Sequence, residues 1–326
     1  MRNFTFKGLL LTAVFMLLGC LSIQAANDDL ITKQITINLD KAGTLPNKIA
    51  SSEMYKITNL KIIGEINGTD WNMIREMAGR DNRGYGTEGK LSVLDLSEAK
   101  IVKGGDSYYP GDNCYTSNDE IGEKAFTDCS RLTSLTLPVG ITSIGYDAFA
   151  YCSGLTSLTL PAGITSIGEY AFSGCSGLTS LTLPAGITSI DKYAFSGCSR
   201  LTSLTLPAGI TSIGEFAFSY CSGLTSIYVY AEKVPRIGRY AFEGCASRKC
   251  TLYVPKGTYD NYRLSEFGYF ENIVEFDATG IDKTTTSTDV EEVSRYSVNG
   301  QRLAVPVKGL NIVKYSDGSA RKVVVK

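Results

Sequence analysis

Six cysteines recur at a nearly constant spacing, and thiols can ligate a metal, form disulfides or act as nucleophiles. No C-x-x-C pair, the usual signature of a zinc site, occurs among them. The chain also contains no histidine, the commonest metal ligand. We therefore expect no metal and no cofactor. The spacing instead predicts a row of buried free thiols, because cysteine packs as a small apolar side chain. The six are Cys129, Cys152, Cys175, Cys198, Cys221 and Cys245.

Two further cysteines, Cys114 and Cys250, lie outside this spacing. A disulfide that involves either of them stays open at this point.

The absence of histidine also bears on catalysis. It removes the Ser-His-Asp triad and the Cys-His pair. The sequence shows no phosphate-binding loop and no nucleophile elbow. A carboxylate-based glycosidase would need two carboxyl groups within about 10 Å of each other, and the repeated part of the chain offers no such pair. We predict that the protein is not an enzyme, and the glycosidase remains the minor alternative.

The cysteines belong to a repeat of 23 residues, whose third copy reads GEYAFSGCSGLTSLTLPAGITSI. In the preceding copy, Leu155, Leu158 and Leu160 have the LxxLxL spacing of a short strand, and Pro161 ends it. One coil cannot bury its own apolar face, whereas stacked coils bury one another's. The predicted fold is therefore an α/β repeat, mostly β, in the form of a solenoid with short parallel strands. The copies begin at Gly122, Gly145, Gly168, Asp191, Gly214 and, after one inserted residue, Gly238.

The consensus LTSLTLPxGITSIGxxAFxxCSxL resembles the BspA-like leucine-rich repeats of surface proteins from gram-negative oral and gut anaerobes. With degenerate flanks, the resemblance covers roughly residues 57–276. That family is associated with adhesion and with recognition of host or bacterial surfaces. The resemblance implies the same role here, with one strand per coil in a continuous parallel sheet.

The flanks predict further units. Residues 27–121 are expected to form an N-terminal cap with divergent repeats, 122–250 the regular repeats, and 251–278 a C-terminal cap. In the first unit we expect a helix over Asp70 to Ala78, capped by Thr69 or Asp70, with Trp71 packed inside the cap.

Beyond the caps, residues 279–292 are polar and predict a linker, and residues 293–326 predict a small β-hairpin module. Asn299-Gly300 and Asp317-Gly318 are its two turn signals. The strings YSVNGQRL (296–303), KGLNIVK (308–314) and KVVVK (322–326) together resemble the end of a type IX secretion sorting domain, although a full domain is about twice as long. A β appendage without a role in export is the alternative.

Residues 1–26 have the features of an export signal peptide. The apolar run from Leu9 to Leu18 is too short to span a bilayer, and Ala25 and Ala26 offer a cleavage site. Leu17 to Cys20 resembles a lipoprotein cleavage box, so lipidation of Cys20 is the alternative. No later stretch is apolar enough for a membrane helix. We expect a protein at the outer-membrane surface or outside the cell.

Candidate binding residues lie on the outer face of the predicted strands. That face is either a solvated surface of good strand formers or a hydroxyl array that binds an extended polymer, with the tyrosines as anchors. We predict the second. The residues are Ser157, Thr159, Ser180, Thr182, Ser203, Thr205, Ser226, Tyr228 and Tyr230.

A second row, formed by Tyr170, Tyr193, Phe216 and Tyr240, either contacts a partner or packs between coils. The net charge of −1, without a concentrated basic face, gives no reason to expect nucleic-acid binding. We expect a monomer whose partners are host or bacterial surface proteins or glycans. A purely structural surface spacer is the alternative, because a spacer requires length and no unique face.

Overall fold

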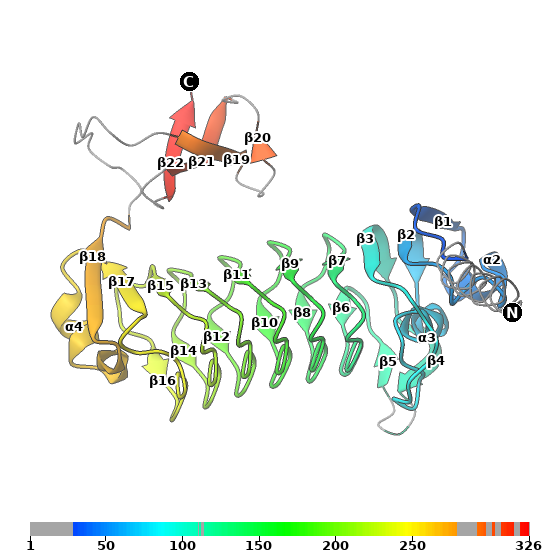
Figure 1. Cartoon of the computed structure of the whole chain (residues 1–326), viewed down its shortest axis with the longest axis horizontal. Coiled ribbons are helices and arrows are strands. Elements are labelled where there is room, and N and C mark those ends of the chain that lie inside the picture. The colour runs from blue at the N-terminus through cyan, green and yellow to red at the C-terminus, as the bar shows by residue number, and fades with distance from the viewer. Residues whose placement is uncertain are drawn as a thin grey trace, which may run out of the picture.

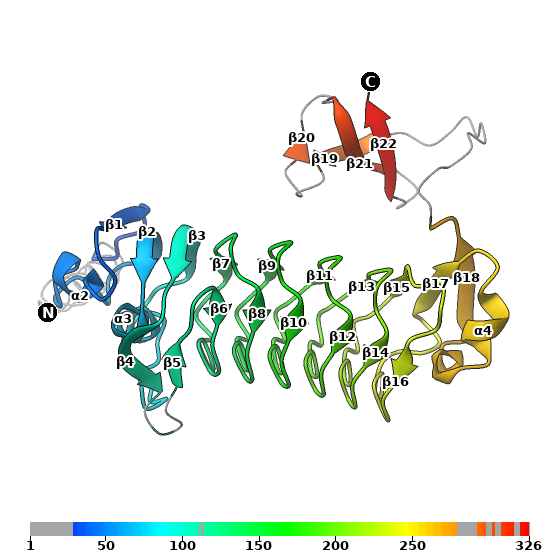
Figure 2. The ribbon, with the colours of Figure 1, turned by 180° about the vertical axis from the view of Figure 1, so that it is seen from behind.

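The computed structural model describes residues 29–109, 111, 114–278, 292–297, 302–303, 308–315 and 320–325. Residues 29–278 wind into an elongated solenoid of stacked coils (Figures 1 and 2). The predicted solenoid of short parallel strands is confirmed. Two parallel sheets, each of five strands, follow one another along one side of it. The first holds β1 (Ile35–Leu39), β2 (Asn59–Ile66), β3 (Val93–Ile101), β7 (Ser134–Thr136) and β9 (Ser157–Thr159). The second holds β11 (Ser180–Thr182), β13 (Ser203–Leu206), β15 (Ser226–Val229), β17 (Thr251–Pro255) and β18 (Asn272–Phe276).

The coils continue across the junction between these two sheets. The Thr179 N–H donates to the Thr156 carbonyl at 3.2 Å. The parallel ladder also begins earlier than the expected residue 57, because β1 pairs with β2. We refer to the whole ladder as the main sheet.

Each regular coil contains a second strand that the sequence analysis did not predict. These strands have two residues each, for example Ser166–Ile167, and they form three-stranded parallel sheets on another side of the coils. The expectation of one strand per coil was wrong because a two-residue segment is too short to show alternation. They are β6 (Glu120–Ile121), β8 (Ser143–Ile144), β10 (Ser166–Ile167), β12 (Ser189–Ile190), β14 (Ser212–Ile213) and β16 (Arg236–Ile237).

The core consists of rows of identical side chains, one from each coil. The phenylalanine row is stacked with centroid distances of 5.0 Å between Phe149 and Phe172 and 5.1 Å between Phe172 and Phe195. Rows of leucine, isoleucine, alanine and cysteine pack beside it. Each coil therefore buries the face that the coil before it leaves open.

The N-terminal cap contains α2 (Leu45–Lys48), α3 (Gly68–Met77) and an antiparallel pair, β4 (Gly104–Tyr109) and β5 (Cys114–Thr116). Helix α3 begins two residues before the predicted start, and Asn67 is its N-cap. The Asn67 side chain accepts from Thr69 N–H, and the Asp70 carboxylate accepts from Asn67 N–H. Asp70 thus completes a capping box from the third helical position, which is why the predicted cap at Thr69 or Asp70 was wrong.

Side chains of α3 close the first regular coil. Trp71 is buried, as expected, and its Nε1 donates to the Ala125 carbonyl at 3.0 Å. Nη1 of the buried Arg75 donates to the carbonyls of Lys124 and Ala125 at 2.8 and 2.9 Å. The Tyr108 hydroxyl donates to the Glu123 carbonyl at 2.9 Å. The cap therefore supplies donors to the carbonyls of Glu123, Lys124 and Ala125 at this end of the coil stack.

Replacing Arg75 by methionine is expected to lower the free energy of unfolding by about 2–3 kcal/mol, because hydrogen bonds from a buried charged donor are lost and the Lys124 carbonyl loses its side-chain donor. Urea unfolding measures the change. The exposed Arg83→Met is the control and should stay within about 0.5 kcal/mol of wild type. Equal unfolding midpoints for the two variants would show that Arg75 does not stabilise this end.

The C-terminal cap follows β17 and contains α4 (Tyr259–Arg263) and the short 3-10 helix η2 (Glu266–Tyr269). Tyr262, Phe267 and Phe270 are buried under it. The remaining described residues form an antiparallel sheet in the order β20 (Arg302–Leu303), β19 (Glu292–Ser297), β21 (Gly309–Tyr315) and β22 (Ala320–Val325). This agrees with the predicted β module. The expected signal peptide, the residues of both turn signals and nearly all of the expected linker lie outside the described residues.

Candidate functional site

The outward face of the main sheet carries the predicted binding residues in register. Thr159 lies beside Thr136, and Thr182 beside Thr205. The serine row runs parallel to it, with Ser203 beside Ser180 and Ser226. The serines and threonines of β9 and β11 are exposed, and those of β13 and β15 are half-buried. The hydroxyl groups therefore form two parallel rows in register along the solenoid.

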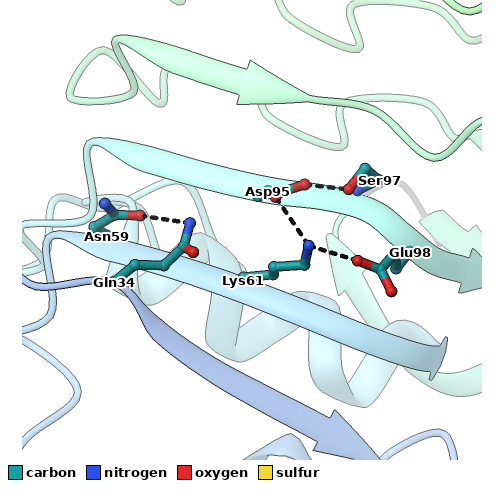
Figure 3. Close-up of polar contacts among 6 residues, drawn as sticks. All are labelled: Gln34, Asn59, Lys61, Asp95, Ser97 and Glu98. Atoms are coloured by element: carbon teal, nitrogen blue, oxygen red, sulfur yellow. Dashed lines mark hydrogen bonds and ion pairs between the residues drawn. The ribbon is translucent and has the colours of Figure 1, made fainter.

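The threonine row becomes charged toward the N-terminal cap, where Lys61 and Asp95 occupy the same register positions. Figure 3 shows the Lys61 ammonium between two carboxylates, 3.5 Å from Asp95 Oδ2 and 2.6 Å from Glu98 Oε1. The hydrogen bond with Glu98 raises the pKa of Lys61. Burial opposes ionisation of Asp95, but hydrogen bonds from Ser97 and the charge of Lys61 lower its pKa overall. This end of the face is a charged patch with its ions already paired.

Toward the C-terminal cap the same row becomes aromatic, because Thr205 lies beside Tyr228 and Tyr228 beside Tyr253. The rings of Tyr228 and Tyr253 are stacked at 4.4 Å. Phe276 packs edge-on against Tyr228 and Tyr230 at 6.0 and 5.1 Å. Burial raises the pKa of Tyr228 and of Tyr230. We call Tyr228, Tyr230, Tyr253 and Phe276 the aromatic cluster.

Sequence reasoning found the first two members of the aromatic cluster and missed Tyr253 and Phe276. Tyr253 stands between Leu252 and Val254, as Tyr228 stands between Ile227 and Val229, so the local pattern was available. The interval between the two tyrosines is 25 residues instead of 23, which hid their common register. The structure shows half-buried rings that pack on one another rather than separate exposed anchors.

The second aromatic row packs between coils. Tyr170 and Tyr193 stack at 4.7 Å, and Tyr193 and Phe216 at 4.8 Å. Each of these residues has a left-handed backbone, with φ of 57° at Tyr170 and 56° at Tyr193. The ring faces in the interior of this row are thus covered by neighbouring rings, as the packing interpretation predicted.

The repeated cysteines are buried free thiols, as predicted. They point in one direction, since Cys175 Sγ donates to the Phe149 carbonyl at 3.1 Å and Cys198 Sγ to the Phe172 carbonyl at 3.4 Å. Burial raises the pKa of Cys175 to about 12. Cys114 and Cys250 are also buried, and neither of them forms a disulfide. These thiols pack as apolar side chains in the hydrophobic core.

No cluster of three or more histidine, cysteine or acidic side chains that could hold a metal ion occurs among the described residues. Within that same part of the chain, no helix is long and apolar enough to cross a membrane.

Comparison with known proteins identifies the repeat. Residues 119–249 match the family described as the BspA type leucine rich repeat region, in six copies. No curated protein matches the chain.

Similar solved structures include a leucine rich repeat protein of T. pallidum, 30% identical, with a TM-score of 0.38. The match covers 42% of this chain and 62% of that one. A leucine rich cell surface protein of Faecalibacterium prausnitzii is 23% identical over 68% of this chain and 51% of that one, with a TM-score of 0.34. The pneumococcal vaccine antigen PcpA is 13% identical over 75% of this chain and 68% of that one, with a TM-score of 0.40. The chain thus spans less than two thirds of the first two proteins.

Proposed function

We propose that this protein is a non-enzymatic, cell-surface binding scaffold that recognises proteins or glycans through the outward face of its main sheet. The observation that supports this most is the register of that face. A single row runs from Lys61 and Asp95, through repeated threonines, to Tyr228 and Tyr253. A face that is charged at one end and aromatic at the other gives an extended partner a direction in which to bind.

The energetics of this face favour an extended ligand. One net hydrogen bond contributes about 1 kcal/mol, so a single pair of hydroxyl groups binds weakly. Neighbouring strands repeat the pair roughly every 4.8 Å, which gives many contacts to a polymer that lies along the solenoid. The aromatic cluster adds a larger buried surface at one end. Because its rings pack on one another, it acts as a unit.

Export is part of the proposal. The signal-like residues 1–26 support secretion, either by cleavage near Ala26 or by lipidation of Cys20. The described C-terminal sheet is compatible with a sorting module of the type IX kind. Mass spectrometry of the mature N-terminus distinguishes the two forms of export, since only the lipoprotein would carry a diacylglyceryl group on Cys20.

Placing two arginines on the main sheet is expected to weaken binding at least tenfold. Thr182→Arg and Thr205→Arg change register partners on the proposed face. The bulky side chains would hold an extended ligand away from the hydroxyl rows. The probes are immobilised extracellular-matrix proteins and a glycan array, and binding of the purified protein is read by surface plasmon resonance.

The control places the same two arginines on another side of the same coils. Ser189→Arg and Ser212→Arg are register partners in β12 and β14 and add the same charge. The control should bind like wild type. Loss of binding in the control but not in the main-sheet variant would move the site to the second strands. Equal binding by both variants would place the site on neither of these two sides, and failure of the wild type to bind any probe would favour the spacer.

A further inference from the structure

A third ladder of backbone hydrogen bonds runs through the turns between the two kinds of strand. In every regular coil except the last, the N–H groups of three alternate residues donate to carbonyls of the following coil. Tyr170, Phe172 and Gly174 donate to Lys192, Ala194 and Ser196 at 3.1, 2.7 and 2.7 Å. The bonds all run in one direction, so one end of this turn ladder presents carbonyls and the other presents N–H groups.

The two ends of the turn ladder differ in whether their backbone groups have hydrogen-bond partners. At the first coil, the N-terminal cap supplies donors from Trp71, Arg75 and Tyr108 to the carbonyls of Glu123 and Ala125, which are two of the three acceptor positions of the ladder there. At the last coil, the equivalent donors are the N–H groups of Tyr240, Phe242 and Gly244. Within the part of the chain that the structure describes, no acceptor is bonded to any of these three groups.

The unpaired donors lie beside a cavity of about 460 Å³ between the last coil and the C-terminal cap. Figure 1 shows β16 of that coil next to the cap. Tyr240 and Phe242 line the cavity, and Gly244 is exposed at the next donor position. The backbone at Tyr240 keeps the left-handed conformation of the interior coils, with φ of 58°. The turn therefore has the same backbone conformation as the equivalent turns of the earlier coils, each of which donates to carbonyls of the next coil.

The side chains around the cavity indicate what fits. Ile237, Phe242 and Tyr269 provide apolar and aromatic walls. Two carboxylates, Glu243 and Glu266, line the cavity together with one guanidinium, Arg239, which lies over the Tyr240 ring at 5.6 Å. The net charge of these walls is negative, which disfavours a phosphate or a carboxylate and favours a ligand with a basic group.

We propose that this open end of the turn ladder binds an extended peptide segment of a partner protein, which carries a basic side chain. Its backbone carbonyls take the place of the missing coil and accept from Tyr240, Phe242 and Gly244, as in the addition of a strand to a sheet edge. The basic side chain pairs with Glu243 or Glu266. A second copy of this chain does not fit, because two of its three matching carbonyls, those of Glu123 and Ala125, are already bonded to Trp71, Arg75 and Tyr108. This site is separate from the proposed binding site on the outward face of the main sheet.

A phage-displayed library of seven-residue peptides, selected on the purified protein, supplies the probe. The selected peptides should be rich in lysine or arginine. Added to isotope-labelled protein, they should shift the amide resonances of Tyr240, Phe242 and Gly244, and leave those of the interior donors Phe149 and Phe172 unchanged.

Two Glu→Lys variants test whether the negative charge of the cavity walls binds the basic side chain of the peptide. Glu266→Lys should weaken binding of the selected peptide at least tenfold. The exposed Glu232→Lys, which does not line the cavity, should leave binding unchanged. Peptides that shift main-sheet amides instead, or a library that yields no binder with a Kd below about 1 mM, would overturn the proposal. The Thr182→Arg, Thr205→Arg variant should still bind the selected peptide. That result would show that the peptide site is independent of the proposed site on the outward face of the main sheet.

Discussion

Raising the pH from 8 to about 10 should unfold the solenoid. Burial raises the pKa of Cys129 to about 11 and those of Cys175 and Cys250 to about 12, and it also raises the pKa of Cys152 and Cys245. In the unfolded chain a thiol ionises near pH 8.5. Above that pH the unfolded state binds fewer protons than the folded state, so stability falls as the pH rises.

The size of this effect follows from the number of thiols. Each one lowers the free energy of unfolding by about 1.4 kcal/mol per pH unit between its unfolded and folded pKa. Five together give a slope of about 7 kcal/mol per pH unit, against a total stability of about 5–15 kcal/mol for a typical domain. Denaturant unfolding at a series of pH values, under a reducing agent, measures the slope.

The variant Cys175→Ala isolates one thiol. It should reduce the slope by about 1.4 kcal/mol per pH unit, whatever its stability at pH 7. Thiol labelling at pH 8 provides a second readout, and full labelling is expected only after denaturation. Stability that stays level between pH 8.5 and 10, or native thiols that label readily at pH 8, would contradict the burial of the row.

The interior of the repeats could be predicted from sequence because every coil provides the same environment. Phe172 and Cys175 recur with one period, and a side chain repeated at that period must meet its own copies in the neighbouring coils. The free thiols followed from the same reasoning. The second strand could not be predicted, because Ser166 and Ile167 alone carry no periodicity.

The ends of the solenoid were harder to predict, since they depend on contacts between residues far apart in the chain. Trp71 and Arg75 reach carbonyls 50 or so residues away. No local pattern in the helix identifies those acceptors. At the other end, the unpaired donors at Tyr240 and Phe242 become visible only when the direction of the turn ladder is known. The candidate site on the main sheet was predictable in its hydroxyl rows and incomplete in its aromatic cluster.

Truncating one ring in the middle of the phenylalanine row should lower the free energy of unfolding by about 3–5 kcal/mol. Phe195 is fully buried and stacks on Phe172 and Phe218 at 5.1 and 5.3 Å. Alanine at this position leaves a cavity and removes both ring pairs. Because each coil is stabilised by its two neighbours, the loss should also weaken the coupling between the two halves of the solenoid. A broadened or two-step urea transition would report that loss of coupling.

Tyr193→Ala is the matched control, in the same coil and also between two stacked rings, at 4.7 and 4.8 Å. Its ring is only half-buried, so water fills the vacated space and no closed cavity forms. We expect a loss of about 1–2 kcal/mol, mostly from the two ring pairs, and a single transition. If Tyr193→Ala destabilised the protein as much as Phe195→Ala, ring stacking alone would account for the coupling between coils. A larger loss at Phe195 assigns the difference to burial, and therefore to the core on which the main sheet and its hydroxyl rows are packed.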